Sequence, residues 1–231
     1  METSITDLVY PDQNALIRLL KELTDFFAQS SAVNRIFAFG SMARGDWDRW
    51  SDIDLLIVTQ SGPGQQWQLF NKLTQNKPIL HRHPFIAMEP SGGFVPGIVF
   101  EDESVFHMLD LNFISLAEYR SFQALERFGE LRELFIAGED HLELESENST
   151  SFKPEIANPD EQRIGAGIHW TKKAIKNSLR GSGNIDELAI TTQRLKEIML
   201  DFPEDKPVPG GNICCLAQQY IEIADFLLDQ S

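Results

Sequence analysis

The stretch FGSMARGDWDRWSDIDLLIV, residues 39–58, predicts the fold more strongly than any other part of the chain. It joins two apolar runs, 35–39 and 52–58, which predict two buried strands. The first run ends at Gly40 and Ser41, where the chain turns into a short helix. Backbone N–H groups at the start of a helix attract anions. The absence of a side chain at Gly40 and the hydroxyl of Ser41 both suit a phosphate at this turn.

Two carboxylates open the second predicted strand. Asp52 and Asp54 are two positions apart, so both side chains point to one face of the strand, while Ile53 points to the other. Their separation along the strand is roughly 6 to 7 Å. Carboxylate oxygens at this spacing suit a divalent cation, and Mg²⁺ keeps phosphate oxygens among its ligands. A phosphate turn beside metal-binding carboxylates indicates nucleotidyl transfer.

The same stretch resembles the signature of the DNA polymerase β-like nucleotidyltransferase superfamily. That signature is a hydrophobic residue, Gly, Gly or Ser, a spacer, and then alternating Asp and hydrophobic residues. In this chain it corresponds to Phe39, Gly40, Ser41, the spacer 42–51, and then Asp52, Ile53, Asp54 and Leu55. The pattern looks most like the minimal bacterial branch, which includes aminoglycoside and lincosamide nucleotidyltransferases and the antitoxins of nucleotidyltransferase-type toxin pairs.

The family also has a third carboxylate on a later strand. Asp110, in FHMLDLNFIS, is the expected residue because it lies within a strongly apolar run, where a charge is costly without a compensating partner. An aspartate at a strand end facing solvent is the alternative reading. Glu101, Asp102 and Glu103 compete for the role, but they lie together in a turn-like cluster.

The resemblance implies a role for each of these residues. Asp52 and Asp54 would hold the metal that binds the nucleotide phosphates. Asp110 would bind a second metal or act as general base on the acceptor hydroxyl. The expected cofactor is therefore Mg²⁺, with two ions during turnover, each stabilising one of the reacting oxygens.

The nucleotide phosphates are expected at Gly40, Ser41 and Arg44. Arg44 lies on the first turn after the strand, where it can reach the triphosphate or pair with Asp46 or Asp48. Later in the chain, the run HWTKKAIKN has lysines expected on one helix face. That face either closes over the triphosphate or is exposed to solvent. The lysines are Lys172, Lys173 and Lys176.

The remaining pattern predicts an α+β fold: a mixed sheet of about five or six strands flanked by helices, and a small C-terminal helical domain. Predicted helices cover 13–28, 65–74, 115–127, 161–180, 185–201 and 212–229, and further strands cover 79–88, 94–100, 105–114 and 131–136. SLAE at 115–118 is a capping box. The predicted division is a nucleotidyltransferase domain at 1–137, an acidic linker at 138–160 and a helical domain at 161–231.

Composition narrows the classes of partner. The chain has 231 residues with 35 acidic and 20 basic side chains, a net charge of −15, so nucleic acid is not expected as a partner and a cationic one is favoured. No apolar run is long enough to cross a bilayer, and the first residues lack the layout of a signal peptide. The two cysteines, at 214 and 215, offer no disulfide framework. A cytoplasmic location is expected.

These observations predict a metal-dependent nucleotidyltransferase that moves a nucleoside monophosphate, AMP from ATP, to a hydroxyl of a small-molecule acceptor. An acidic surface favours a cationic acceptor, such as an antibiotic-like compound. The alternative is an antitoxin-like subunit that binds or AMPylates a partner protein. The sequence leaves open the acceptor, the nucleobase, the oligomeric state and whether the helical domain binds acceptor or partner chain.

Overall fold

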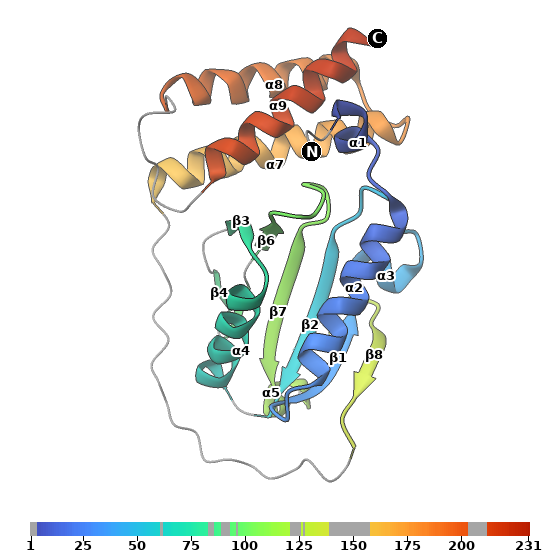
Figure 1. The fold of residues 1–231 in the computed structure, drawn as a ribbon, viewed down its shortest axis with the longest axis vertical. Helices are drawn as coiled ribbons and strands as arrows, with labels where there is room; N and C mark the ends of the chain where they lie inside the picture. The colour runs from blue at the N-terminus through green and yellow to red at the C-terminus, as the bar shows by residue number, and fades with distance from the viewer. Residues whose placement is uncertain are drawn as a thin grey trace.

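The computed structural model describes residues 4–60, 62–82, 86–88, 93–95, 97–120, 126, 128–138, 158–202 and 212–231 (Figure 1), with the backbone alone at 86–88 and 93–95. Most of the predicted linker, residues 139–157, lies outside the described residues. The domain boundaries at 137 and 161 therefore stay a prediction.

A six-stranded mixed sheet forms the centre of the first part of the chain, in the order β3-β6-β7-β2-β1-β8. Its strands are β1 (Val33–Ala38), β2 (Ile53–Thr59), β3 (Ile79–Arg82), β6 (Gly97–Phe100), β7 (Leu109–Ser115) and β8 (Arg132–Ile136). Only β2 and β7 pair in parallel within this sheet. Two short strands, β4 (Ile86–Met88) and β5 (Gly93–Val95), form a separate antiparallel pair.

The helices flank this sheet or form a bundle at one end of it (Figure 1). They are α1 (Ile5–Val9), α2 (Gln13–Ala28), α3 (Gly40–Arg44), α4 (Pro63–Asn76), α5 (Leu116–Tyr119), α7 (Pro159–Leu179), α8 (Ile185–Leu200) and α9 (Ile213–Asp229). The mixed six-stranded sheet, its flanking helices and the C-terminal bundle of α7, α8 and α9 confirm the predicted fold class. None of the described helices has the length and apolar character needed to cross a membrane.

The alternation of β2 divides its side chains between two apolar clusters. Ile53, Leu55 and Ile57 are buried against α2 and α4. Leu56 and Val58 are buried on the other face of the sheet, with Phe37 and Ile114. Asp54 is an even number of positions from Leu56 and Val58, so its carboxylate lies on the same face of the strand as these side chains, away from α2 and α4.

The helical bundle has a core of its own, and that core extends to the sheet. Phe106, in the loop before β7, is buried among bundle residues and packs edge-on against Tyr220 of α9 at a ring-centroid distance of 6.0 Å. The buried Tyr220 hydroxyl donates a hydrogen bond of 2.5 Å to the carbonyl of Val105. The bundle is therefore held against the loop from which β7 starts.

Four expected elements differ in extent. The strand expected at 94–100 is divided between β5 and β6, which belong to different sheets. The strand expected at 105–114 begins only at Leu109, because Val105 and Phe106 contact the bundle instead of a neighbouring strand. The strand expected at 79–88 is divided between β3 and β4, which pair in different sheets. The helix expected to reach residue 127 gives α5, which ends at Tyr119, while residues 121–125 and 127 lie outside the described part. The predicted capping box at Ser115 is present.

Candidate active site

Gly40 lies so close to Asp54 that a residue with a Cβ atom would not fit at position 40. Gly40 begins α3 with φ +62°, in the left-handed region that favours glycine. A Cβ atom there would lie 2.2 Å from Oδ2 of Asp54. The backbone N–H of Phe39 donates a hydrogen bond of 3.1 Å to the carbonyl of Asp54, which holds the two strands in this position.

Asp54 and Asp110 lie side by side because β2 and β7 are parallel and in register. Asp54 is paired with Asp110, one residue from the start of each strand. Burial, followed by the negative charges of Asp110 and Asp52, raises the pKa of Asp54 to about 7. Burial and the charge of Asp52 raise the pKa of Asp110 to about 6. Within the part of the chain that the structure describes, neither carboxylate forms an ion pair.

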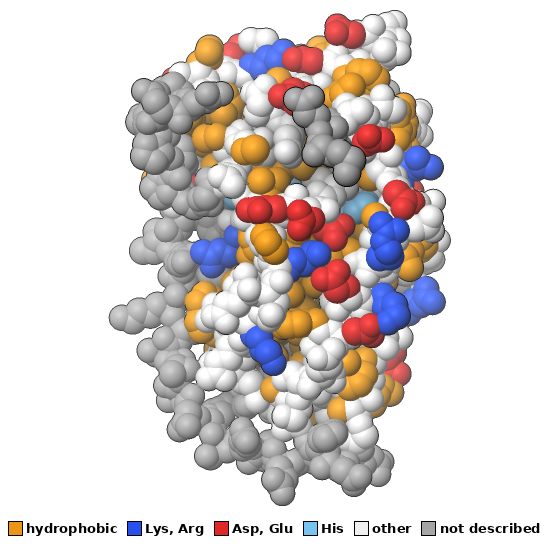
Figure 2. All heavy atoms as spheres, viewed as in Figure 1, with side chains coloured by type: hydrophobic (Ala, Val, Ile, Leu, Met, Phe, Trp, Pro, Cys, Tyr) orange, Lys and Arg blue, Asp and Glu red, His pale blue; other side chains and the backbone are white. Residues whose placement is uncertain are grey.

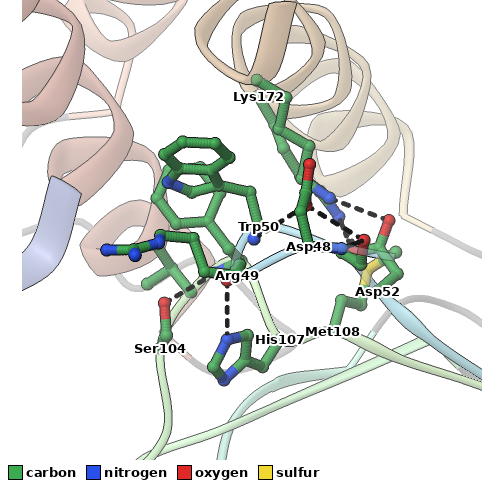
Figure 3. Close-up of polar contacts among 12 residues, drawn as sticks. Asp48, Arg49, Trp50, Asp52, Ser104, His107, Met108 and Lys172 are labelled. Atoms are coloured by element: carbon green, nitrogen blue, oxygen red, sulfur yellow. Dashed lines mark hydrogen bonds and ion pairs between the residues drawn. The ribbon is translucent and has the colours of Figure 1, made fainter. Parts of the chain in front are cut away.

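Asp52, immediately before β2, has a different environment. Lys172 and Lys176 reach it from α7, one to each oxygen, with Nζ–Oδ1 and Nζ–Oδ2 distances of 2.7 and 3.0 Å. Figure 3 shows Lys172 extending from its helix toward Asp52. Burial disfavours the Asp52 carboxylate, but the two ammonium groups outweigh burial and lower its pKa.

The lysines are buried with it. The side chain of Lys172 is 11% exposed and that of Lys176 is 9% exposed. Burial and the neighbouring charge of Lys172 lower the pKa of Lys176 to about 8. Lys173, expected on the same face, is instead exposed and lies over the ring of Trp170 at 5.3 Å. Lys172 and Lys176 therefore place two positive charges at the carboxylate cluster.

A second contact ties the bundle to the turn before Asp52. Arg180, which caps the end of α7, binds both carboxylate oxygens of Asp48 at 2.6 and 2.8 Å. Asp48 also accepts hydrogen bonds from the backbone N–H of Trp50 and the hydroxyl of Ser51, so it organises the turn itself. Below that turn, Nε2 of the buried His107 is 3.0 Å from the carbonyl of Arg49 (Figure 3).

The other predicted site residues take less defined positions. Ser41 follows Gly40 in α3 and is half-buried. Arg44 is exposed, and its Nε pairs with Asp46 at 3.2 Å, which is one of the alternatives left open by the sequence. Glu103 pairs with Lys77 at 3.1 Å, so this competitor of Asp110 is engaged elsewhere.

The aspartates supply the kind of ligand that a magnesium ion needs. Mg²⁺ requires oxygen ligands and is commonly held by one or two carboxylates together with water and substrate phosphates. Asp54 and Asp110 are the residues that could hold such an ion, since each is a half-buried carboxylate without an ion-pair partner among the described residues. No group of three or more acidic, histidine or cysteine side chains within the described ranges is arranged to hold a metal. The protein thus offers a two-carboxylate site, with Asp52 held by lysines beside it.

The comparison with protein families bears directly on this site. Residues 17–91 match the family model of the nucleotidyltransferase domain. The match includes β1, the turn at Gly40 and β2, and so covers Asp52 and Asp54 but not Asp110. It confirms the nucleotidyltransferase resemblance at the level of the domain and indicates a transferase, with the substrate unassigned.

The other comparisons add less. No curated protein matches the chain. A solved structure from H. pylori, described as a candidate nucleotidyltransferase, is 12% identical over 95% of this chain and 96% of that chain, with a TM-score of 0.28. A likeness of this strength supports no conclusion about fold or function.

Figure 2 shows acidic and basic side chains interspersed on the face in view. The sequence alone did not pair Asp52 with Lys172 and Lys176, or Asp48 with Arg180, because these residues are more than 100 positions apart. The only signal was the row of lysines in HWTKKAIKN.

Proposed function

We propose that this protein transfers AMP from ATP to a hydroxyl group of a small-molecule acceptor. The observation that carries the proposal is the in-register pair of half-buried carboxylates, Asp54 and Asp110, beside the turn at Gly40. Two carboxylates placed together in a buried strand pair destabilise a fold unless a cation or a proton compensates them. The matched nucleotidyltransferase domain supports a metal-bound nucleotide as the source of that cation.

The carboxylates have distinct roles in this proposal. Asp54 would hold the Mg²⁺ that binds the nucleotide, Asp52 would join it when its lysine contacts are exchanged for the metal, and Asp110 would act as general base on the acceptor hydroxyl. When bound, Mg²⁺ would neutralise charge on the phosphates and stabilise the leaving pyrophosphate. A pKa of about 6 makes Asp110 suited to accept a proton near neutral pH.

The proposed reaction is an in-line displacement at phosphorus. The acceptor oxygen attacks the α-phosphorus of ATP as Asp110 takes the hydroxyl proton. The bond from the α-phosphorus to the bridging oxygen breaks, and pyrophosphate leaves with that electron pair. Lys172 and Lys176, which already lie at the carboxylates, would attract the phosphate oxygens. Ser41, Arg44 and the backbone after Gly40 would bind the terminal phosphates.

The acceptor is expected to be cationic, like an aminoglycoside, because a chain with a net charge of −15 attracts cations. The test uses purified protein, labelled ATP and Mg²⁺ with a panel of cationic and neutral hydroxyl compounds. Label on a small molecule supports the proposal. Label only on a co-purified protein overturns it in favour of the antitoxin-like alternative.

Substitution of single carboxylates separates their roles. Asp52→Asn and Asp54→Asn should each weaken Mg²⁺-dependent binding of a non-hydrolysable ATP analogue, measured by calorimetry. Asp110→Asn should retain this binding but lower transfer by about a hundredfold, the scale expected for loss of a general base. Asp229→Asn, an exposed aspartate at the end of α9, is the control and should match the parent in both assays. Full transfer by Asp110→Asn would exclude it as the base.

A further inference from the structure

A groove of about 660 Å³ runs between α7 and α8, on a surface that the proposed reaction does not use. Its floor and walls are formed mainly by small and apolar side chains: Ala166, Gly167, Trp170, Ile190, Thr191 and Ile198. Gly167 sets its depth, because a Cβ atom there would lie 2.9 Å from Cδ1 of Leu195. The two helices therefore pack closely along the groove.

The groove and the carboxylate site lie on different faces of α7. Lys172 and Lys176 point to Asp52 and are buried. Ala166, Gly167 and Trp170 lie at helical spacing on another face, turned by more than a quarter of the helix circumference from those lysines. The groove is therefore separate from the site that would bind nucleotide.

Large apolar side chains are exposed along this groove. Trp170 is 54% exposed and Ile190 is 53% exposed. At the two ends of α8, outside the lining of the groove, Ile185 is 40% exposed and Leu200 is 81% exposed. Scattered single apolar residues on a surface are ordinary, but a group of them over one helix pair marks an interaction surface.

Charges on the same face indicate what covers it. Glu187 and Arg194 are exposed on α8, three residues before Ile190 and four residues after it. Within the described ranges neither side chain forms an ion pair, and both line the groove. The chain as a whole carries a charge of −15, which opposes self-association. This face instead presents acidic side chains, Asp186 and Glu187, at one end of an apolar centre and arginines at the other end, Arg194 and Arg163, of which Arg163 pairs with Asp201.

We propose that the groove face binds a second copy of this chain, with α8 antiparallel to α8 of the second copy about a two-fold axis near Ile190 and Thr191. In that arrangement Glu187 faces Arg194 of the second copy, and the symmetry makes the same pair twice. A self-complementary patch with this order of charges fits an isologous dimer. Ile190 and Trp170 then lose solvent contact at the centre, where buried aromatic and aliphatic side chains supply most of the binding energy.

The first test is sedimentation equilibrium of the full chain over about 1 to 100 μM, a range in which a dimer changes its population with concentration. The parent should show a dimer, and Ile190→Glu should raise the dissociation constant at least about tenfold. Ile17→Glu on α2 is the matched control, since Ile17 is 41% exposed on a different surface, and should leave it unchanged. A monomeric parent, or a dimer that Ile190→Glu does not weaken, overturns the proposal.

The second test uses charge reversal, which keeps the proposal falsifiable if Ile190→Glu does not fold. Glu187→Arg and Arg194→Glu each place two like-charge pairs across the interface, so each variant alone should dimerise about tenfold more weakly. An equimolar mixture of the two should recover dimers, because each reversed residue then faces its opposite charge. Failure of the mixture to recover them would overturn the antiparallel arrangement and with it the proposal.

Discussion

Replacing Asp54 with asparagine should stabilise the fold at neutral pH while weakening nucleotide binding. Burial and the neighbouring Asp110 and Asp52 raise the pKa of Asp54 from 3.8 to about 7. The charged form is therefore disfavoured in the folded protein relative to the unfolded chain. Asparagine has nearly the same shape and carries no charge, so it should remove this cost without leaving a cavity.

The magnitude follows from the pKa. A change from 3.8 to about 7 corresponds to about 4 kcal/mol at about 1.36 kcal/mol per pH unit. Water that reaches the partly exposed carboxylate screens part of this electrostatic cost. We therefore expect the free energy of unfolding of Asp54→Asn to exceed that of the parent by about 2 kcal/mol at pH 8.

The pH dependence gives the sharper test. A carboxylate whose pKa is raised on folding binds its proton more tightly in the folded state, so the parent loses stability as the pH rises from about 4 to about 7. Asp54→Asn lacks this loss, and its advantage should disappear near pH 4, where Asp54 is protonated in the parent. The assay is urea denaturation of both proteins at a series of pH values.

Asp229→Asn is again the matched control and should change the free energy of unfolding by less than about 0.5 kcal/mol at every pH. Mg²⁺ with a nucleotide should reduce the difference between Asp54→Asn and the parent, because it stabilises only the protein that retains the carboxylate. An Asp54→Asn variant that is less stable than the parent at pH 8 would refute the reasoning, as would a gain that does not depend on pH.

Two further predictions concern the residues around the carboxylates. Gly40→Ala should lower the free energy of unfolding by about 3 kcal/mol, because its Cβ atom would overlap the Asp54 carboxylate. Gly45→Ala is the control, since Gly45 also has a positive φ but no atom lies within 4 Å of the added Cβ. It should lose only about 1 kcal/mol in the same urea assay. Arg180→Ala should lower the free energy of unfolding by about 1 kcal/mol, because it removes the two hydrogen bonds to Asp48, and it should also weaken ATP-analogue binding. Arg180→Lys should recover part of both losses. Unchanged nucleotide binding in Arg180→Ala would show that this contact does not position the turn before Asp52.

The sequence by itself determined the strands β1 and β2 and the positions of Asp52 and Asp54 where β2 begins. The alternation of apolar residues at 53–58 fixes which side chains of β2 are buried on each face, and that assigns Asp54 a face as well. Gly40 was predicted to let a phosphate come close to the backbone, which stays a prediction; the structure shows that a carboxylate oxygen of Asp54 lies close to it. These properties depend on residues close together in the chain, where spacing translates directly into geometry.

Only the tertiary structure decided which charges meet. The parallel register of β2 and β7 places Asp54 beside Asp110, and no local pattern determines the alignment of strands that are 56 residues apart. The same is true of Lys172 and Lys176, which neutralise Asp52 while Asp54 and Asp110 remain without a cationic partner in the described part of the chain. Electrostatic energy depends on distance and burial, and both are set when the bundle packs against the sheet.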